Sequence, residues 1–344
     1  MSRLRKISEA IALTAFAVIL VAFSEALSEC VISSINVCIN VIIPSMFAFM
    51  VISSYILSSG IYRIIFKPLY IILKPILPLS EEIFSVFCLS LIGGYPVGVK
   101  LLKELIAENK NYSAIAEKTA VFSYCISPTF AVVMLGLGLY NSTEAGLIIY
   151  ISCVVSNLIM AVIISHTENM MITSHISNKK SSLIQSINSS SSALFRICSV
   201  IVIFNVAITA ADCVSEAAGV KLPVIIKAFF EISNILNAEI RTLNLLPLVT
   251  FLASTGGACV LFQCSSIIQG SFSVKSFILS RIPTALIAGV VSLLIVKFWD
   301  ISLPVSSVNR VYTFGVSTNN TVIVLLIAMC VILLQKSEKN FKKG

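Results

Sequence analysis

Two pairs of adjacent glycines interrupt apolar stretches of this 344-residue chain, and no other feature restricts its fold as strongly. The first pair opens the segment Gly93-Gly94-Tyr95-Pro96-Val97-Gly98-Val99-Lys100, and the second opens Gly256-Gly257-Ala258-Cys259-Val260-Leu261-Phe262-Gln263. In both segments a polar side chain, Lys100 or Gln263, follows the first glycine by seven residues. An apolar run precedes each pair and a helix-like run follows it, so the sequence predicts two helices that break at glycine.

The apolar run before the first pair is too short to cross a membrane. As an α-helix, residues 82–92 rise about 16 Å, which is roughly half of a ~30 Å hydrocarbon core. A segment that goes halfway in, breaks and returns is a re-entrant hairpin, and its free backbone groups need protein or a water-filled cavity around them. Two such hairpins in corresponding positions are typical of the midplane site of a secondary transporter. We expect them at residues 82–106 and 243–269.

The composition supports a membrane location. Hydrophobic residues make up 57% of the chain and charged residues 12%, which is about half the charged fraction of soluble domains. The net charge of +8 does not indicate a nucleic-acid partner, because the cations lie in short segments beside apolar spans, as in the positive-inside pattern. We therefore expect an all-α polytopic membrane protein with about seven to nine transmembrane helices, whose partner is the lipid bilayer.

Long aliphatic runs with few charges mark the candidate spans. They cover residues 8–27, 31–58, 116–139, 147–165, 193–213, 277–298 and 321–335. A shorter stretch with charges precedes each expected hairpin, at residues 62–77 and 223–236. Such segments suit helices that lie at the membrane interface, where cationic side chains reach the headgroups.

The order of these segments repeats, which predicts two structural repeats. Matching features of the two halves are 154 to 163 residues apart. Pro44 and Cys198 are 154 residues apart, and Gly93 and Gly256 are 163 residues apart. If the amino terminus and the Lys179-Lys180 loop are both cytoplasmic, the two repeats have inverted orientations. We expect an N-terminal transmembrane helix at 1–30, the first repeat at 31–165, a polar cytoplasmic linker at 166–192, the second repeat at 193–300, and a C-terminal transmembrane helix with a basic tail at 301–344.

The tail leaves one alternative open. Seven spans place the basic tail on the non-cytoplasmic side of the membrane, whereas the positive-inside rule favours the cytoplasmic side. Either a further span exists or the tail is an exception to the rule.

Cysteine and histidine give no sign of a metal or a cofactor. Ten cysteines are present, many within apolar runs and none in a Cys-x-x-Cys pattern, so they are interpreted as packing residues. The two histidines, His166 and His175, fall in one polar loop without an acidic or cysteine ligand at metal spacing. An enzyme is also disfavoured, because Ser127 or Ser45 as a nucleophile would need a nearby base.

Several motifs resemble those of one family. Pro44-Ser45-Met46-Phe47-Ala48-Phe49, followed by Gly94-Tyr95-Pro96-Val97-Gly98-Val99-Lys100, resembles the sporulation integral membrane protein family YlbJ, also called SpoVV. Glu231-Ile232-Ser233-Asn234 and the second glycine segment resemble the family's acidic and second glycine motifs. The resemblance covers roughly residues 41–298. It implies membership of the nucleoside-recognition (Gate) group, transport of dipicolinate, and a location in the cell membrane or the outer forespore membrane of a spore-forming bacterium.

Three features of the candidate site each have two interpretations. A mid-depth cation at Lys100 needs a partner, for which an anionic substrate is one candidate, or it extends to the interface. Glu231 is a coupling-site carboxylate or the ion-pair partner of Lys227. The Ser127-Pro128 kink lines the same cavity or serves packing. The predicted substrate-binding residues are Gly93, Gly94, Tyr95, Pro96, Gly98, Lys100, Ser127, Pro128, Glu231, Asn234, Gly256, Gly257 and Gln263.

The functional hypothesis is a secondary transporter or channel for a small organic anion, with dipicolinate as the favoured substrate. It includes a coupling ion, H⁺ or Na⁺, and self-association into a homo-oligomer. Two alternatives remain, a nucleoside-type Gate transporter and a non-transporting assembly or signalling protein that spore formation needs.

Overall fold

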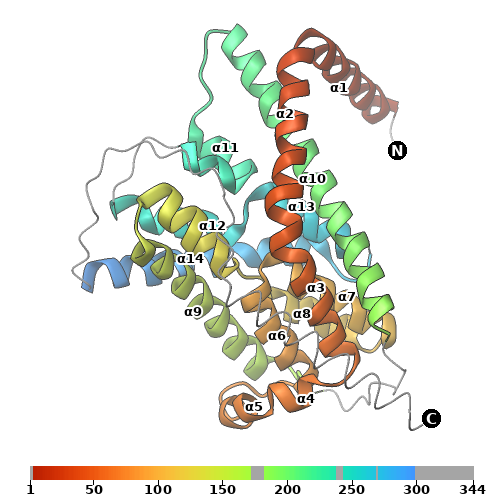
Figure 1. Ribbon diagram of the computed structural model, residues 1–344, viewed down its shortest axis with the longest axis vertical. Helices are drawn as coiled ribbons and strands as arrows, with labels where there is room; N and C mark the ends of the chain where they lie inside the picture. Colours follow the sequence, from red (N-terminus) through yellow and green to blue (C-terminus); the bar gives the residue numbers. More distant parts are fainter. Residues whose placement is uncertain (1–2, 172–181, 238–242, 269, 299–344) are drawn as a thin grey trace. The chain divides into compact units, whose positions relative to one another are not determined.

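The computed structural model describes residues 3–171, 182–237, 243–268 and 270–298, and within them every element is helical (Figure 1). The elements are α1 (Arg3–Ala22), α2 (Ser24–Val37), η1 (Cys38–Ile42), α3 (Ile43–Ser58), α4 (Tyr62–Ile65), α5 (Lys67–Leu73), α6 (Glu81–Gly93), α7 (Tyr95–Glu108), α8 (Tyr112–Phe122), η2 (Phe130–Leu139), α9 (Thr143–Thr167), α10 (Leu183–Ala217), α11 (Val224–Phe230), η3 (Ile232–Asn237), η4 (Leu243–Leu245), α12 (Leu246–Thr255), α13 (Gly257–Ile268) and α14 (Val274–Phe298).

Five helical segments within these residues are long and apolar enough to cross a membrane. They are Ser24–Ser58, Thr143–Thr167, Leu183–Ala217, Leu246–Ile268 and Val274–Phe298. A chain whose described part is all-helical and contains such segments is an integral membrane protein, because backbone groups within a helix find their partners even in lipid. The predicted span at 321–335 and the basic tail lie outside the described residues.

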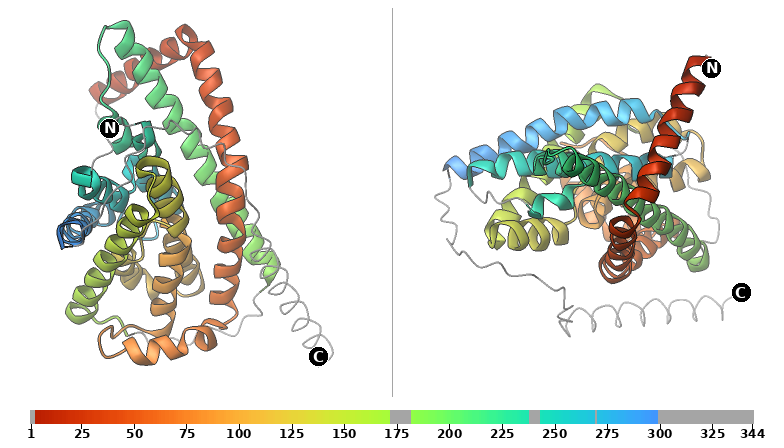
Figure 2. Two further views of the ribbon diagram at one scale, coloured as in Figure 1. Left: turned by 60° about the vertical axis from the view of Figure 1, so that its left-hand side comes forward. Right: turned by 90° about the horizontal axis from the view of Figure 1, so that it is seen from above.

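Two long rods pack side by side. In the first, α2, the π-helical turn η1 and α3 follow one another without a break, and the second rod is α10 (Figures 1 and 2). The Thr209 hydroxyl donates to Cys30 Sγ at 3.1 Å, and Cys38 Sγ donates to the Cys198 carbonyl at 3.9 Å. The rods are antiparallel, because the residue numbers rise along the first rod from Cys30 to Cys38 while those of their partners on α10 fall from Thr209 to Cys198.

Part of the predicted linker at 166–192 is helix instead. Helix α9 continues to Thr167, and α10 begins at Leu183, so the serine run at 189–192 is helical. Ser190 is fully buried, and the Ser191 hydroxyl donates to the carbonyl four residues earlier at 2.9 Å. Serine is common in linkers, but on a helix its hydroxyl bonds to the backbone and its small size lets neighbouring helices approach.

Both predicted breaks are present at the glycine pairs. Helix α6 ends at Gly93, and Gly94, with φ of 88° and ψ of −178°, separates it from α7. Helix α12 ends at Thr255, and Gly256 follows in the left-handed conformation with φ of 76°. Such dihedrals cost little for glycine and much for residues with a Cβ atom, so these positions explain where the helices stop.

The two breaks differ in how their helices continue. Helices α6 and α7 pack against one another, whereas α12 and α13 make few mutual contacts. Helix α12 packs on α14 and α9, while α13 packs on α7 and α10. The packed hairpin predicted for 243–269 is therefore wrong in this respect, because other helices occupy the faces that a hairpin would join.

The predicted span at 116–139 is also wrong as a continuous helix. Helix α8 ends at Phe122, and the π-helical segment η2 begins at Phe130. Pro128 lacks a backbone donor, and a residue before proline is pushed away from helical dihedrals, so Ser127 is disfavoured within a helix. Hydropathy alone registers the apolar composition on both sides and misses this break.

The short helices before each break have exposed apolar faces. Ile64 on α4 and Ile72 on α5 are 72% and 70% exposed, and Phe229 on α11 is 53% exposed. These exposed faces suit contact with lipid at the membrane interface, as the sequence predicts for the two segments. The helices are shorter than the predicted segments 62–77 and 223–236, since α5 ends at Leu73 and α11 ends at Phe230.

Candidate functional site

The two glycine breaks meet at the centre of the described core. The Tyr95 hydroxyl, from the start of α7, donates to the Ala253 carbonyl of α12. The Tyr124 hydroxyl, just after α8, donates to the Thr255 carbonyl at 2.8 Å. The two tyrosine rings lie 4.7 Å apart between centroids. Two buried aromatic side chains therefore connect the broken end of α12 to the first break.

Glycine allows this close approach at two positions. A Cβ atom at Gly98 would lie 2.0 Å from the Ser123 carbonyl oxygen, so α7 contacts the segment after α8 at backbone distance. A Cβ atom at Gly256 would lie 2.2 Å from the Tyr124 hydroxyl. Any larger residue at either position would push these segments apart.

Ser127 and Pro128 lie beside the first break. A Cβ atom at Gly94 would be 3.0 Å from Ser127 Cβ, and the Ser127 hydroxyl accepts a hydrogen bond from the Phe130 amide at 3.2 Å. That bond satisfies one of the free amides at the start of η2, as an N-cap residue does. The pair thus belongs to the central cluster, where it ends one segment and starts the next.

Glu231 lies near the second break, beside Cys259 of α13. Its Oε1 accepts from the Ser233 hydroxyl at 3.1 Å, and its Oε2 is buried without a hydrogen-bond partner. Burial raises the pKa of this carboxyl, which lies beside the Cys259 thiol in the connection between α11 and η3. The Asn234 amide donates to the Glu231 carbonyl at 3.2 Å and so holds the turn.

The ion-pair interpretation of Glu231 is wrong. Lys227 Nζ bonds Asp212 Oδ2 at 2.7 Å, and Asp212 belongs to α10. Glu231 follows the last turn of α11, where extended backbone carries it away from the Lys227 side chain. Among the described residues no cation pairs with this carboxyl, so its coupling-site interpretation remains a hypothesis.

Lys100 has a partner within the chain. Its side chain is almost fully buried, and Nζ bonds Glu104 Oε1 at 2.8 Å, one turn further along α7. It also donates to the Ser54 hydroxyl of α3, and the Ser189 hydroxyl of α10 donates to the same Glu104 oxygen. A substrate is therefore not needed to neutralise Lys100, because Glu104 does so.

A polar pocket of about 290 Å³ opens beside this ion pair. Helices α7, α10 and α13 line it, and its charged side chains are Lys100, Lys103, Glu104 and Arg196. Gln185, Ser189 and Ser192 add hydrogen-bonding groups. Three cations against one carboxylate leave two positive charges in excess, so this basic pocket attracts anions.

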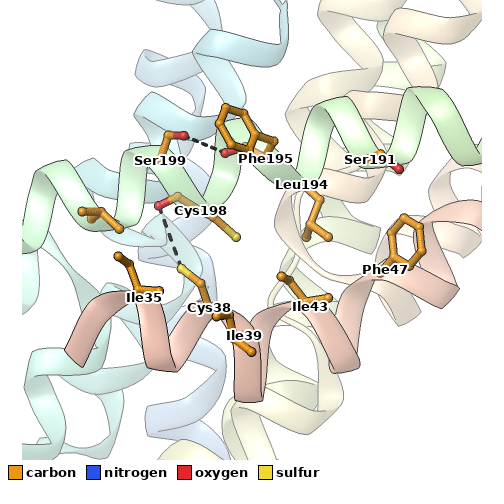
Figure 3. A pocket seen from close by; sticks show the side chains of 11 residues that line it. Ile35, Cys38, Ile39, Ile43, Phe47, Ser191, Leu194, Phe195, Cys198 and Ser199 are labelled. Atoms are coloured by element: carbon orange, nitrogen blue, oxygen red, sulfur yellow. Dashed lines mark hydrogen bonds between the residues drawn. The ribbon is translucent and has the colours of Figure 1, made fainter. Parts of the chain in front are cut away.

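A second cavity has the opposite character. It measures about 500 Å³ and lies where the two long rods cross, among aliphatic and aromatic side chains such as Ile39, Leu194 and Phe195 (Figure 3). Its few polar groups include the Cys38 thiol, which is already bonded to the Cys198 carbonyl. Such a lining suits lipid chains or apolar ligands and gives an anion no partner.

The remaining predicted residues are all buried, but they do not share one surrounding. Gly93, Pro96 and Gly257 line the two breaks. Gln263 donates to Cys259 Sγ at 3.3 Å and thus lies on the Glu231 side. Lys100, at the equivalent spacing in the first segment, faces the basic pocket instead. The matched spacing of Lys100 and Gln263 therefore does not give them matched environments.

Three important residues do not figure in the sequence-based prediction. Glu104 lies four residues after Lys100, the spacing of a helical ion pair, and could have been found from that. Arg281 is a charge within an apolar span, which is itself a functional signal. Tyr124 has no such signal, because its role depends on the break that follows it.

The thiols and acidic groups give no metal centre in the described part of the chain. Nine cysteines there are free, and no three His, Cys, Asp or Glu side chains cluster as metal ligands would. No family model matches the chain, and no curated protein and no solved structure is significantly similar to it.

Proposed function

We propose that this membrane protein is a secondary transporter or channel for a small organic anion. The basic pocket is the observation that carries the proposal, because its excess positive charge is next to a broken helix in a protein otherwise suited to lipid. Cations are rare inside such proteins and mark substrate or ion pathways. The Lys100–Glu104 pair holds one of the three cations in place. Lys103 and Arg196 form no ion pair among the described residues, and Arg196 Nη1 donates to the Ser266 carbonyl at 3.1 Å.

Two inverted repeats are part of the proposal. In a two-fold arrangement, residues on the axis contact their own counterparts. Pairs separated by a nearly constant number of residues do contact each other: Cys38 with Cys198 and Val121 with Arg281 are 160 apart, and Ser113 with Ser271 is 158 apart. These separations fall within the 154 to 163 residues found between matching sequence features. Inverted repeats allow the protein to open alternately to either side.

The substrate follows from the family resemblance. The YlbJ/SpoVV-like motifs imply dipicolinate, a small aromatic dicarboxylate, and a membrane around the developing spore. The two excess charges of the basic pocket match the two carboxylates of this anion. Glu231, with its raised pKa, is the proposed site for a coupling proton.

Uptake of labelled dipicolinate into proteoliposomes tests the function. Lys103→Gln removes one positive charge from the pocket without breaking the Lys100–Glu104 pair. Loss of a charge-assisted hydrogen bond weakens affinity by roughly ten- to a hundredfold, so the apparent KM should rise by at least about tenfold. Lys110→Gln, at an exposed position beyond the same helix, is the matched control and should transport normally.

The outcomes separate the hypotheses. Equal flux in the parent and in Lys103→Gln, with Lys100→Gln also unchanged, would exclude the basic pocket as the pathway. No flux in the parent at matched protein levels would favour the assembly-protein alternative.

A further inference from the structure

Arg281 is a buried cation with no opposite charge beside it among the described residues. It lies on α14, within a candidate membrane span, and is 1% exposed. None of the ion pairs in the described part of the chain includes it. A buried, unpaired guanidinium is strongly unfavourable, so something else must compensate its charge.

The contacts of Arg281 satisfy only part of the guanidinium. Nη2 donates to the Val121 carbonyl near the end of α8, and Nε and Nη2 lie 3.4 and 3.3 Å from the Ser280 hydroxyl. Its Cζ lies 4.9 Å from the centre of the Tyr124 ring and 5.3 Å from that of Phe277. Nη1 is buried and has no acceptor, so two N–H donors are left without partners.

Other buried polar atoms without partners lie close to the same tyrosine. Ser123, which precedes Tyr124, has a buried hydroxyl without a partner. The hydroxyl of Ser254, which precedes the Thr255 that Tyr124 bonds, has only the Cys153 thiol beside it. Native proteins leave few such atoms, so several of them on Arg281 and on residues next to Tyr124 and Thr255 indicate a ligand or water that completes the bonding.

We propose that Arg281 binds a carboxylate group of the transported anion through Nη1, at a deep site beside the two glycine breaks. The inference rests on the proposed function for the identity of the ligand. A carboxylate supplies both the negative charge and the acceptors that the guanidinium lacks. The ring of Tyr124 stacks on the guanidinium and bonds the end of α12, so occupancy of the deep site couples directly to the second break.

Helix α13 has residues near both Arg281 and the basic pocket. Cys264 of α13 is within electrostatic reach of Arg281, and Ile267, about one turn further along the same helix, lines the pocket.

The competing explanation is structural. Cations near a helix C-terminus are favourable, and Arg281 bonds a carbonyl of the last turn of α8. If Arg281 caps α8, its replacement should lower the stability of the protein without ligand. If Arg281 binds the anion, its replacement should instead reduce the stabilisation that the ligand gives.

Thermal unfolding of the full-length protein in detergent distinguishes the two roles. The probes are dipicolinate, benzoate, and the neutral diamide of dipicolinate, and the variants are Arg281→Met and Arg281→Lys. A binding role predicts that Arg281→Met keeps the parent's Tm without ligand, because an apolar replacement of a buried charge is often neutral or stabilising. Its dipicolinate affinity should fall by roughly ten- to a hundredfold, and Arg281→Lys should recover part of that loss.

Lys275→Gln is the matched control, since Lys275 is an exposed cation on the same helix. It should respond to dipicolinate as the parent does, and the diamide should stabilise none of the proteins. An equal dipicolinate response in Arg281→Met or Arg281→Lys, or no response of the parent to either anion, would overturn the deep site. If the parent transports dipicolinate but the thermal response to dipicolinate does not depend on Arg281, the deep site is rejected and the transport function stands. If the thermal response depends on Arg281 but the parent transports no dipicolinate, the transport function is rejected and the deep site stands.

Discussion

At the scale of single residues, the interior of this protein is organised by what each polar group bonds. Lys100 is neutralised by Glu104, while Arg281 has aromatic rings and one carbonyl but no carboxylate. Lys100 could be picked out in the sequence because it follows the glycine motif at close spacing. Arg281 stands alone in an apolar run, and its missing partner becomes visible only when the helices around it are packed together.

Gly98 gives the residue-scale prediction. Gly98→Ala should lower the free energy of unfolding by about 1–3 kcal/mol, because the added methyl would collide with the Ser123 carbonyl. Gly289→Ala, within α14, is the matched control, since its nearest new contact is an ordinary 3.4 Å. There the substitution should be neutral or stabilise by up to about 1 kcal/mol through helix propensity. Thermal or denaturant unfolding in detergent measures both, and equal stability of the two variants would contradict the close approach.

At the scale of elements, local chemistry predicts the breaks better than it predicts the packing. Glycine pairs explain where α6 and α12 end, because positive φ values are available there at little cost. Whether the following helix folds back depends on distant neighbours, which is why residues 82–106 form a packed pair and residues 243–269 do not. The serine run of α10 could not be recognised as helix from composition, since the Ser189 hydroxyl finds its partner in Glu104 of α7, which is distant in the sequence.

The antiparallel rods give the element-scale prediction. Thr209→Cys places a second thiol opposite Cys30, whose sulfur already lies 3.1 Å from the Thr209 hydroxyl. Mild oxidation should therefore form a disulfide between them, detectable as a linked peptide by mass spectrometry. Ile203→Cys, on the same helix but 63% exposed, should form no such link to Cys30. A link in the control, or none in the test variant, would contradict the register of α2 against α10.

At the scale of the whole molecule, the two halves of the chain are held together by helix packing as well as by their connection. Helix α10 packs along α2 and α3, α14 packs on α9, and α13 packs on α7. Each contact joins an element before residue 172 to one after residue 181. The shared core around the two breaks therefore requires both halves at once.

This packing predicts the behaviour of a cut chain. A protease site inserted between residues 172 and 181 should allow cleavage without separation, so that a tag on the amino-terminal fragment retains the other fragment in mild detergent. Dipicolinate uptake should persist after the cut. Separation in mild detergent would mean that the interhelical contacts are too weak to hold the halves, and denaturing detergent provides the reference for full separation.

The contact between Val121 and Arg281 has an evolutionary consequence. The two residues are 160 apart, and in the proposed two-fold arrangement each occupies the place of the other. An ancestral dimer of identical half-length chains would have put the same side chain at both places, and two arginines there would repel each other in a dry interior. A fused gene is free of that constraint. It can keep a valine on one side and an arginine on the other, so fusion permits a lone positive charge near the axis of the proposed two-fold arrangement.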